Sequence, residues 1–171
     1  MSRPQGRYES EQRSPAEVAE SRRQIRGALR VLRPTAGAPS EPTRARPDAL
    51  LSELDRWASL ALLAAVEAAF RVDYVRRQAR KPKDPLAKAL RAVYRAKGER
   101  ASLEDDILPA WRESLTDDDL RRALSDLKGS YQYRHWLAHG RYWRPNLARL
   151  YNFEDLYDLS SALLAELALL S

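Results

Sequence analysis

The sequence predicts an all-α protein, an up-and-down bundle of four to five helices with an appended N-terminal helix. Three observations predict this fold class. Apolar residues recur at steps of three and four, which is the spacing of one helix face. Several short segments carry the cap residues that begin helices. The chain has 171 residues, of which 44% are hydrophobic, and this is enough for one domain with a buried core.

The first 47 residues are interpreted as a basic, proline-rich extension, and residues 48–171 as the bundle domain. In the extension, Ser14, Pro15 and Glu17 stand where an N-cap, a first helical proline and a capping-box glutamate belong, so a helix is expected over about residues 14–33. We interpret its arginines as a solvated basic face, with RNA contact as the alternative; they are Arg22, Arg23, Arg26 and Arg30. Four prolines in residues 34–47 mark a linker.

A long helix is expected next, capped by Asp48 and covering residues 49–80. Residues 60–66 are all apolar, so this helix should be central to the bundle. Glu67 interrupts the apolar surface one turn before Arg71. We nominate Glu67 as the carboxylate that orients Arg134. The alternative is an ordinary i,i+4 pair with Arg71, worth about 0.2–0.5 kcal/mol.

Apolar spacing and cap residues predict further helices after residue 80. One should end near Lys97, and others should begin near Ser102, Thr116 and Asn152. The last of these helices is expected to close the bundle or to supply a dimer seam. The three acids at 117–119 could be taken for a metal cluster. We favour helix capping, because adjacent helical residues point in different directions.

Residues 71–100 are strongly basic. They contain eleven lysines and arginines against three acids, a local charge of +8 that exceeds the +6 of the whole chain. Such a run can follow a phosphate backbone, although charge runs are also found on merely solvated faces. The residues expected to bind RNA are Arg76, Arg77, Arg80, Lys81 and Lys83.

Composition excludes several classes of site. The chain has no cysteine and only two histidines, so disulfides, thiolate zinc sites and a histidine-rich metal site are not expected. No apolar run approaches the roughly 20 residues that cross a bilayer, and the charged N-terminus lacks a secretory core. We therefore expect a cytoplasmic protein without membrane association.

Residues 131–143 hold the densest chemistry in the chain, with both histidines, two tryptophans, two arginines and three tyrosines. The apolar stripe that leads into them predicts a helix; it consists of Leu120, Ala123, Leu124, Leu127 and Tyr131. Arg134 at the edge of this stripe needs an anionic partner, because a guanidinium cannot shed its charge.

The position of the helix end decides which motif residues meet. If the helix continues to Gly140, Ala138 lies in the middle of the stripe, and Arg134 and His139 point about 140° apart. One regular helix would not aim both at a single atom. Either the helix ends or distorts at Gly140, or the site combines residues from two chains.

The pair Arg134 and His139, separated by four residues near the end of a late helix, resembles the motif of the HEPN superfamily (higher eukaryotes and prokaryotes nucleotide-binding). The family pattern is an arginine, four to six residues of which the first is often polar, and a histidine. His135 is that polar residue here. Many members are metal-independent ribonucleases in toxin–antitoxin, phage-defence and RNA-processing systems. The resemblance covers about residues 48–171.

The resemblance implies cleavage of RNA by its own 2′-hydroxyl, without metal or cofactor, to a 2′,3′-cyclic phosphate. His139 would be the general acid/base and Arg134 the phosphate clamp. His135 would orient the phosphate or carry a second proton, while Arg141 and Tyr142 would hold the scissile phosphate. A lone His139 leaves one proton transfer unassigned, so a homodimer with a composite active site is expected. The RNA is not specified, and tRNA is one candidate.

Two rival functions remain open. The chain could be a non-catalytic helical module that binds RNA, a nucleotide or a protein partner. It could also be a toxin silenced by an antitoxin that modifies Tyr142, although the resembling systems place a tyrosine closer to the histidine. The motif tryptophans, Trp136 and Trp143, are interpreted as core or dimer contacts rather than base-stacking platforms. His135 or His139 could simply cap the last helical carbonyls.

Overall fold

A single long helix, α2 (Pro47–Arg80), is the element against which most of the protein packs. The computed structural model describes residues 14–31, 47–80, 82–139, 149 and 151–170. Within these ranges the fold is an all-α bundle without strands, as predicted. The other α-helices are α1 (Pro15–Val31), α3 (Pro85–Lys97), α4 (Leu108–Ser114), α5 (Asp118–Ala138) and α6 (Phe153–Leu170), with a 3₁₀ turn η2 (Gly98–Arg100) and a π-helical turn η3 (Leu103–Ile107).

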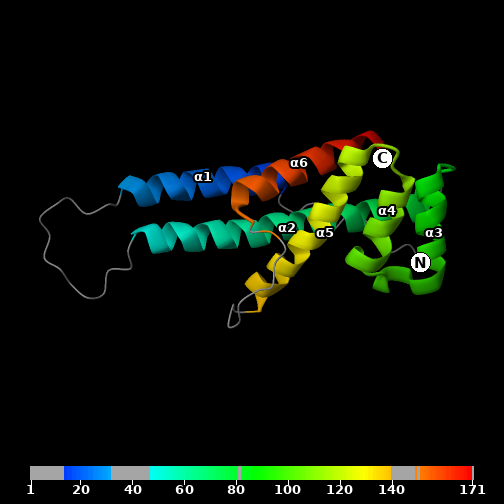
Figure 1. Ribbon diagram of the computed structural model, residues 1–171, viewed down its shortest axis with the longest axis horizontal. Coiled ribbons are helices and arrows are strands. Elements are labelled where there is room, and N and C mark those ends of the chain that lie inside the picture. The colour runs from blue at the N-terminus through cyan, green and yellow to red at the C-terminus, as the bar shows by residue number, and fades with distance from the viewer. Residues whose placement is uncertain (1–13, 32–46, 81, 140–148, 150, 171) are drawn as a thin grey trace, which may run out of the picture.

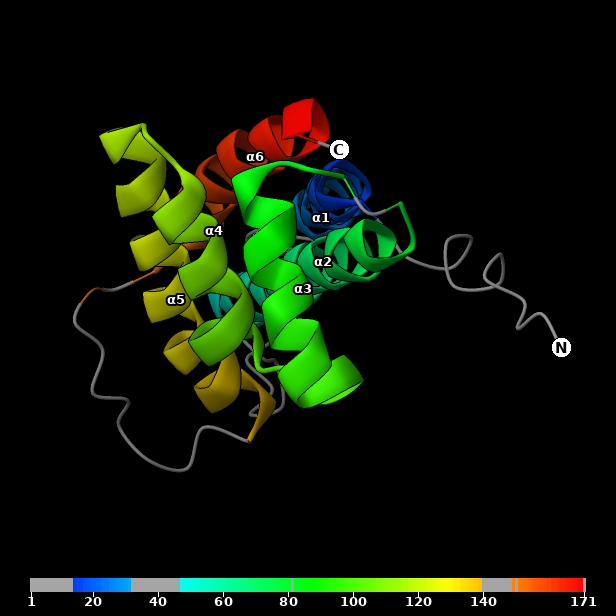
Figure 2. The same cartoon turned by 90° about the vertical axis from the view of Figure 1, so that its right-hand side faces the viewer.

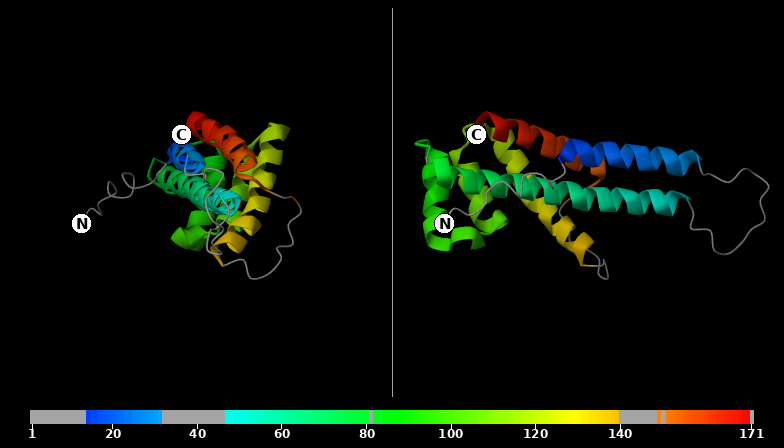
Figure 3. Two further views of the ribbon diagram at one scale, coloured as in Figure 1. Left: turned by 90° about the vertical axis from the view of Figure 1, so that its left-hand side faces the viewer. Right: turned by 180° about the vertical axis from the view of Figure 1, so that it is seen from behind.

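Helix α1 lies alongside α2 in every view in which both are seen lengthwise (Figures 1 and 3). Its start is the predicted capping box. The Ser14 backbone N–H donates to Glu17 Oε2 at 2.6 Å, and the Glu17 N–H donates to Ser14 Oγ at 3.3 Å. The predicted helix is therefore confirmed over Pro15–Val31, while residues 34–46 of the predicted linker lie outside the described residues.

Arg22 corrects the interpretation of α1 as a solvated basic face. Its side chain is only 8% exposed. The guanidinium donates to Asp55 Oδ1 of α2 at 2.8 Å and to Glu154 Oε1 of α6 at 2.7 Å, and it lies 4.1 Å from the centre of the Phe153 ring. Arg22 thus connects three helices, because two carboxylates balance its buried charge.

Helix α2 has one buried and one open face. Leu62, Leu63, Val66 and Phe70 are fully buried on the core side. On the opposite side Trp57 is 63% exposed, so α2 is central to the bundle, as expected, but it is not covered on every side. The helix also begins earlier than predicted, at Pro47, which places Asp48 inside the helix rather than at its cap.

Short capped helices form one end of the bundle, where α3 crosses the end of α2 (Figure 2). Asp84 caps α3 by accepting from the Ala87 N–H at 2.9 Å, and Ser102 Oγ caps η3 by accepting from the Asp105 N–H at 3.1 Å. Helix α6 packs on α1, α2 and α5 and so closes the bundle, which is one of its two expected roles. None of the described helices is both long and apolar enough to cross a bilayer.

Replacement of Arg22 by alanine is expected to lower the free energy of unfolding by about 2–4 kcal/mol, because Asp55 and Glu154 lose a shared buried partner. Urea denaturation followed by circular dichroism measures this change. Arg23→Ala is the matched control: Arg23 is on the same helix, but its side chain is 69% exposed and pairs only locally with Glu20, so little change is expected. Equal effects of the two substitutions would contradict the conclusion that Arg22 connects the three helices.

Candidate functional site

Helix α5 carries the arginine and histidines of the motif. Its N-cap is Asp117, whose carboxylate accepts from the Asp119 and Leu120 N–H groups at 2.8 and 3.0 Å. Capping, the interpretation favoured for this acidic run, is therefore confirmed. The predicted stripe is also confirmed, with Leu124, Leu127 and Tyr131 buried.

The last turn of α5 extends past the core, and Figure 1 shows this end diverging from α2. Ala138 keeps its expected angular position in the middle of the stripe, but it is exposed because it lies beyond the core. The helix ends at Ala138, close to the predicted end. His139 is its C-cap, and the His139 N–H donates to the His135 carbonyl at 3.1 Å. Gly140 lies outside the described residues.

Glu67 joins two arginines of different helices. Its Oε2 lies 3.0 Å from Nη2 of Arg134 on α5, and its Oε1 accepts from Nε of Arg71 at 2.9 Å. The expected contact with Arg134 is therefore present together with the alternative i,i+4 pair. Arg71 also donates from Nη1 to the Ala101 carbonyl at 3.2 Å. One carboxylate shared by two guanidiniums leaves a net charge of +1 at this point.

Tyr131 lies beside Arg134. The arginine guanidinium is 5.9 Å from the centre of the Tyr131 ring, and the phenol donates to the Leu63 carbonyl at 3.4 Å. Burial raises the pKa of Tyr131 well above its ordinary value, so the phenol keeps its proton at neutral pH. The Nε of Arg134 is buried and has no acceptor within the described part of the chain. The Arg134 side chain as a whole is 35% exposed.

The two histidines are in contact. The ring centres of His135 and His139 are 4.1 Å apart, with 50° between the ring planes, and both residues are exposed. Residues four apart on a helix lie on one face, so both imidazoles are presented on the same side of the end of α5. The alternative for these residues is that they cap the last carbonyls of the helix. The structure shows one such contact, in which the backbone N–H of His139 donates to the His135 carbonyl.

Glu104 of η3 was not predicted as part of the site, because the sequence marks it only as an acid in a first helical turn. Burial raises its pKa, with smaller contributions from the neighbouring acids Asp105 and Glu67, while Lys128 and His135 act in the opposite direction. Glu104 therefore lies within electrostatic range of both the Glu67 carboxylate and the His135 imidazole. Lys128 Nζ is 3.4 Å from Asp105 Oδ1, which connects η3 to α5.

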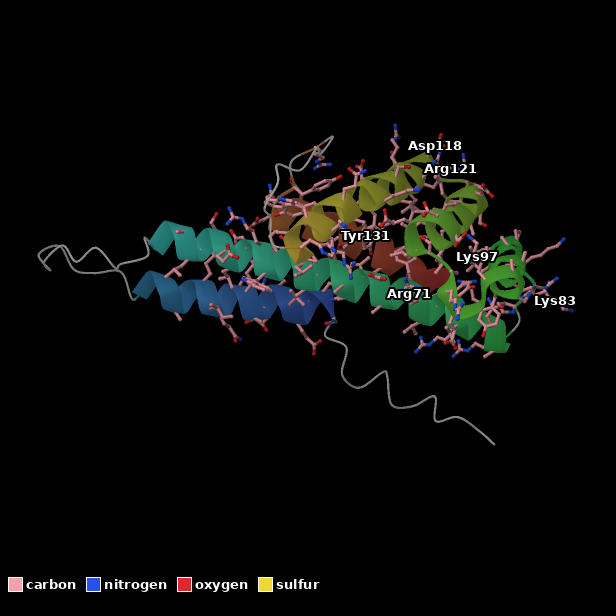
Figure 4. The ribbon with its side chains drawn as sticks, turned by 90° about the horizontal axis from the view of Figure 1, so that it is seen from below. Arg71, Lys83, Lys97, Asp118, Arg121 and Tyr131 are labelled. Atoms are coloured by element: carbon pink, nitrogen blue, oxygen red, sulfur yellow. The ribbon has the colours of Figure 1, made fainter. Side chains whose placement is uncertain are left out.

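The basic residues expected to bind RNA divide into two groups. Arg76, Arg80 and Lys83 are exposed, and Figure 4 shows Lys83 at the α3 end of the molecule, away from Arg71 and Tyr131. Arg77 is a correction. It is buried, pairs with Asp73 at 2.8 Å and Asp84 at 3.5 Å, and lies 5.3 Å from the centre of the Trp111 ring. Its charge stabilises the packing at this end of the bundle and is not available on the surface to bind RNA.

Several other predicted residues lie outside the described residues, namely Lys81, Arg141, Tyr142 and Trp143. Trp136 is described, and its ring stacks on Tyr133 at 5.8 Å with a 26° interplanar angle. Tyr133 stacks in turn on Tyr151 at 6.0 Å. These intramolecular contacts support the structural interpretation of Trp136 over the base-stacking one.

Comparisons of the chain with protein-family models, with curated proteins and with solved structures found no match. Arg134 lies on the helix that ends in two exposed imidazoles, and the Glu67 carboxylate of α2 ties it to Arg71 of α2. Arg134 can bind an oxyanion and the imidazoles can carry protons, but no hydrogen bond or ring contact joins the Arg134 side chain to either histidine among the described residues, and Arg134 and His139 of one regular helix point about 140° apart.

Replacement of Glu104 by glutamine is expected to stabilise the protein at pH 7 by less than about 1 kcal/mol, because the partly exposed carboxylate is screened by solvent. The folded-state pKa of Glu104 is raised, so the folded state binds its proton more readily than the unfolded state. The stability of the unmodified protein should therefore fall as the pH rises from about 4.5, the ordinary value, through the raised pKa. Below about pH 4.5, where Glu104 is protonated in both the folded and the unfolded state, the Glu104→Gln variant should no longer be more stable than the unmodified protein.

The measurement is urea denaturation at several pH values between 4 and 8. Glu99→Gln is the control, since Glu99 is an exposed acid a few residues earlier in the chain. A Glu104→Gln effect of the same size at every pH would argue against a raised pKa.

Proposed function

We propose that this protein is a metal-independent endoribonuclease of the HEPN type, acting as a toxin or defence effector. The observation that supports this best is the arrangement at the end of α5. Glu67 pairs with Arg134, whose side chain is partly exposed, and the two histidine rings are in contact within the next turn. The proposal rests on this geometry together with the resemblance of the Arg134-to-His139 spacing to the family motif.

In the proposed reaction, Arg134 binds the non-bridging oxygens of the scissile phosphate and stabilises the charge that develops on them. Arg71 supports this role indirectly, because it shares the Glu67 carboxylate and leaves the cluster with excess positive charge. His139 takes the proton of the 2′-hydroxyl. The 2′-oxygen then attacks phosphorus, and the 5′-oxygen leaves with a proton. The products are a 2′,3′-cyclic phosphate and a 5′-hydroxyl.

Two proton transfers need two proton carriers. His135 is one candidate for the second, since its ring lies against that of His139. The other is the motif of a second chain, which would make a homodimer with a composite active site. Arg141 and Tyr142 would complete the phosphate contacts in this proposal. An antitoxin protein would restrain the activity, and modification of Tyr142 is one possible mechanism of restraint.

A non-catalytic RNA-binding module is the alternative, and the exposed basic residues at the end of α2 favour it. Thirteen residues separate Glu67 from Arg80 on α2, which is about 20 Å of helix. An RNA backbone held by Arg76, Arg80 and Lys83 would gain most of its binding energy by counterion release, without the motif. In that case the motif residues would have only a structural role.

The first test is cleavage of total RNA and of tRNA by the purified protein in EDTA, with analysis of the 3′ ends. His139→Ala is expected to lower the cleavage rate by about 10²–10⁴-fold, the usual contribution of a general acid or base. Arg134→Lys should also lose most activity, because a lysine cannot make the bidentate contact.

Gln132→Ala is the matched control, since Gln132 is exposed on the same helix, and circular dichroism confirms that each variant is folded. Cleavage that needs an added metal, or that survives both motif substitutions, would refute the proposal. RNA binding without cleavage, abolished by Arg80→Glu with Lys83→Glu, would establish the alternative.

A further inference from the structure

The open face of α2 carries a regular apolar stripe. Its members recur at alternating steps of four and three, and they are Leu50, Leu54, Trp57, Ala61, Ala64 and Ala68. Trp57 is 63% exposed and Leu50 45% exposed, and Ala61 and Ala64 are exposed as well. Alternation of three and four is the spacing at which one helix packs along another. A contiguous exposed apolar surface of this kind marks an interaction site.

The stripe is bordered by a shallow hollow between α2 and the end of α5. Its lining residues are Glu53, Arg56, Trp57, Leu60 and Leu137. Leu137 comes from the same turn of α5 as Arg134, so the apolar stripe lies next to the candidate site. An occupant of the stripe would therefore also face the motif.

We infer that a second copy of this chain docks on the stripe, with the two α2 helices packed antiparallel around a two-fold axis between Ala61 and Ala64. In this register Ala61 meets the partner's Ala64, and Trp57 meets the partner's Ala68. The small central residues allow the two backbones to approach closely. Each tryptophan, the bulkiest member of the stripe, lies opposite one of its smallest members, as close packing requires.

The charges beside the stripe favour the same register. Glu53 and Arg56 pair on one half of α2 at 3.0 Å, and Glu67 and Arg71 pair on the other half at 2.9 Å. The antiparallel register places Glu53 beside the partner's Arg71, and Arg56 beside the turn that holds the partner's Glu67. A parallel register would instead place the charged edges of the two helices on opposite sides of the seam, so that neither of these pairs could form. Opposite charges therefore select the antiparallel pair.

The seam specifies how a composite site could form, and this part of the inference rests on the proposed function. The charged edge of α2 is the edge covered by α5, and an antiparallel pair brings the same edges of both helices together. Both motifs would therefore lie on one side of the seam. The two copies of Glu67 would be offset by about nine residues along the helices, or roughly 14 Å.

The test begins with the mass of the full-length protein in solution, by analytical ultracentrifugation. The unmodified chain is expected to be a dimer, and Trp57→Asp should weaken dimerisation at least tenfold while the helical circular dichroism spectrum is kept. Ile25→Asp is the matched control, because Ile25 is a 49% exposed apolar residue of α1 and is not part of the stripe. A monomer at all concentrations, or equal effects of both substitutions, would overturn the inference.

Engineered cysteines test the register, and the natural absence of cysteine makes the result unambiguous. Leu50 lies opposite the partner's Val75, and Val75 is itself 42% exposed. A Leu50→Cys/Val75→Cys double variant should form a disulfide-linked dimer under mild oxidation. Within one chain these positions are about 38 Å apart, so they cannot link to each other. Neither single variant should cross-link, and a covalent dimer of Leu50→Cys alone would indicate a parallel seam and overturn the inference.

These readouts are independent of catalysis. A cross-linked dimer that does not cleave RNA would support the seam and refute the ribonuclease proposal. A protein that cleaves RNA but stays monomeric would support the ribonuclease proposal and refute the seam.

Discussion

The candidate site depends on one carboxylate shared by two arginines. Glu67 contacts Arg134 at 3.0 Å and Arg71 at 2.9 Å, and Arg71 continues to the Ala101 carbonyl. Helices α2 and α5 and Ala101, which lies between η2 and η3, are thereby held at one point. The pairing also sets the local electrostatics, because Glu67, Arg71 and Arg134 together carry a formal charge of +1, with the Glu104 carboxylate within electrostatic range of Glu67. An anionic ligand would meet a cation that is already positioned.

Arginines elsewhere in the protein show that position, rather than residue type, decides the role. Arg22 and Arg77 are buried with two carboxylates each and lie against aromatic rings, and their charges stabilise helix packing. Arg134 shares its carboxylate and stays partly open to solvent. The difference separates arginines that hold the fold together from one that can also bind a substrate.

Local features were predictable because they depend on neighbours in the sequence. The Ser14–Glu17 capping box, the Ser102 and Asp117 caps and the stripe ending at Tyr131 all occur as expected. The contact of Glu67 with Arg134 was predicted for a more general reason, since a half-buried guanidinium requires an acid. The place of Glu104 was not predictable, because it depends on how η3 packs against α5 and α2.

The sequence by itself determined the helices, their capped starts, the apolar stripes and the spacing of the motif, since these follow from interactions within a few residues. Only the tertiary structure decided which charges are buried and which face of α2 stays open. Burial depends on the elements that cover a residue, and these come from distant parts of the chain. Arg77 and Arg80 are only three positions apart in one basic run. Arg77 is nevertheless buried against Asp84 and Trp111, whereas Arg80 is exposed.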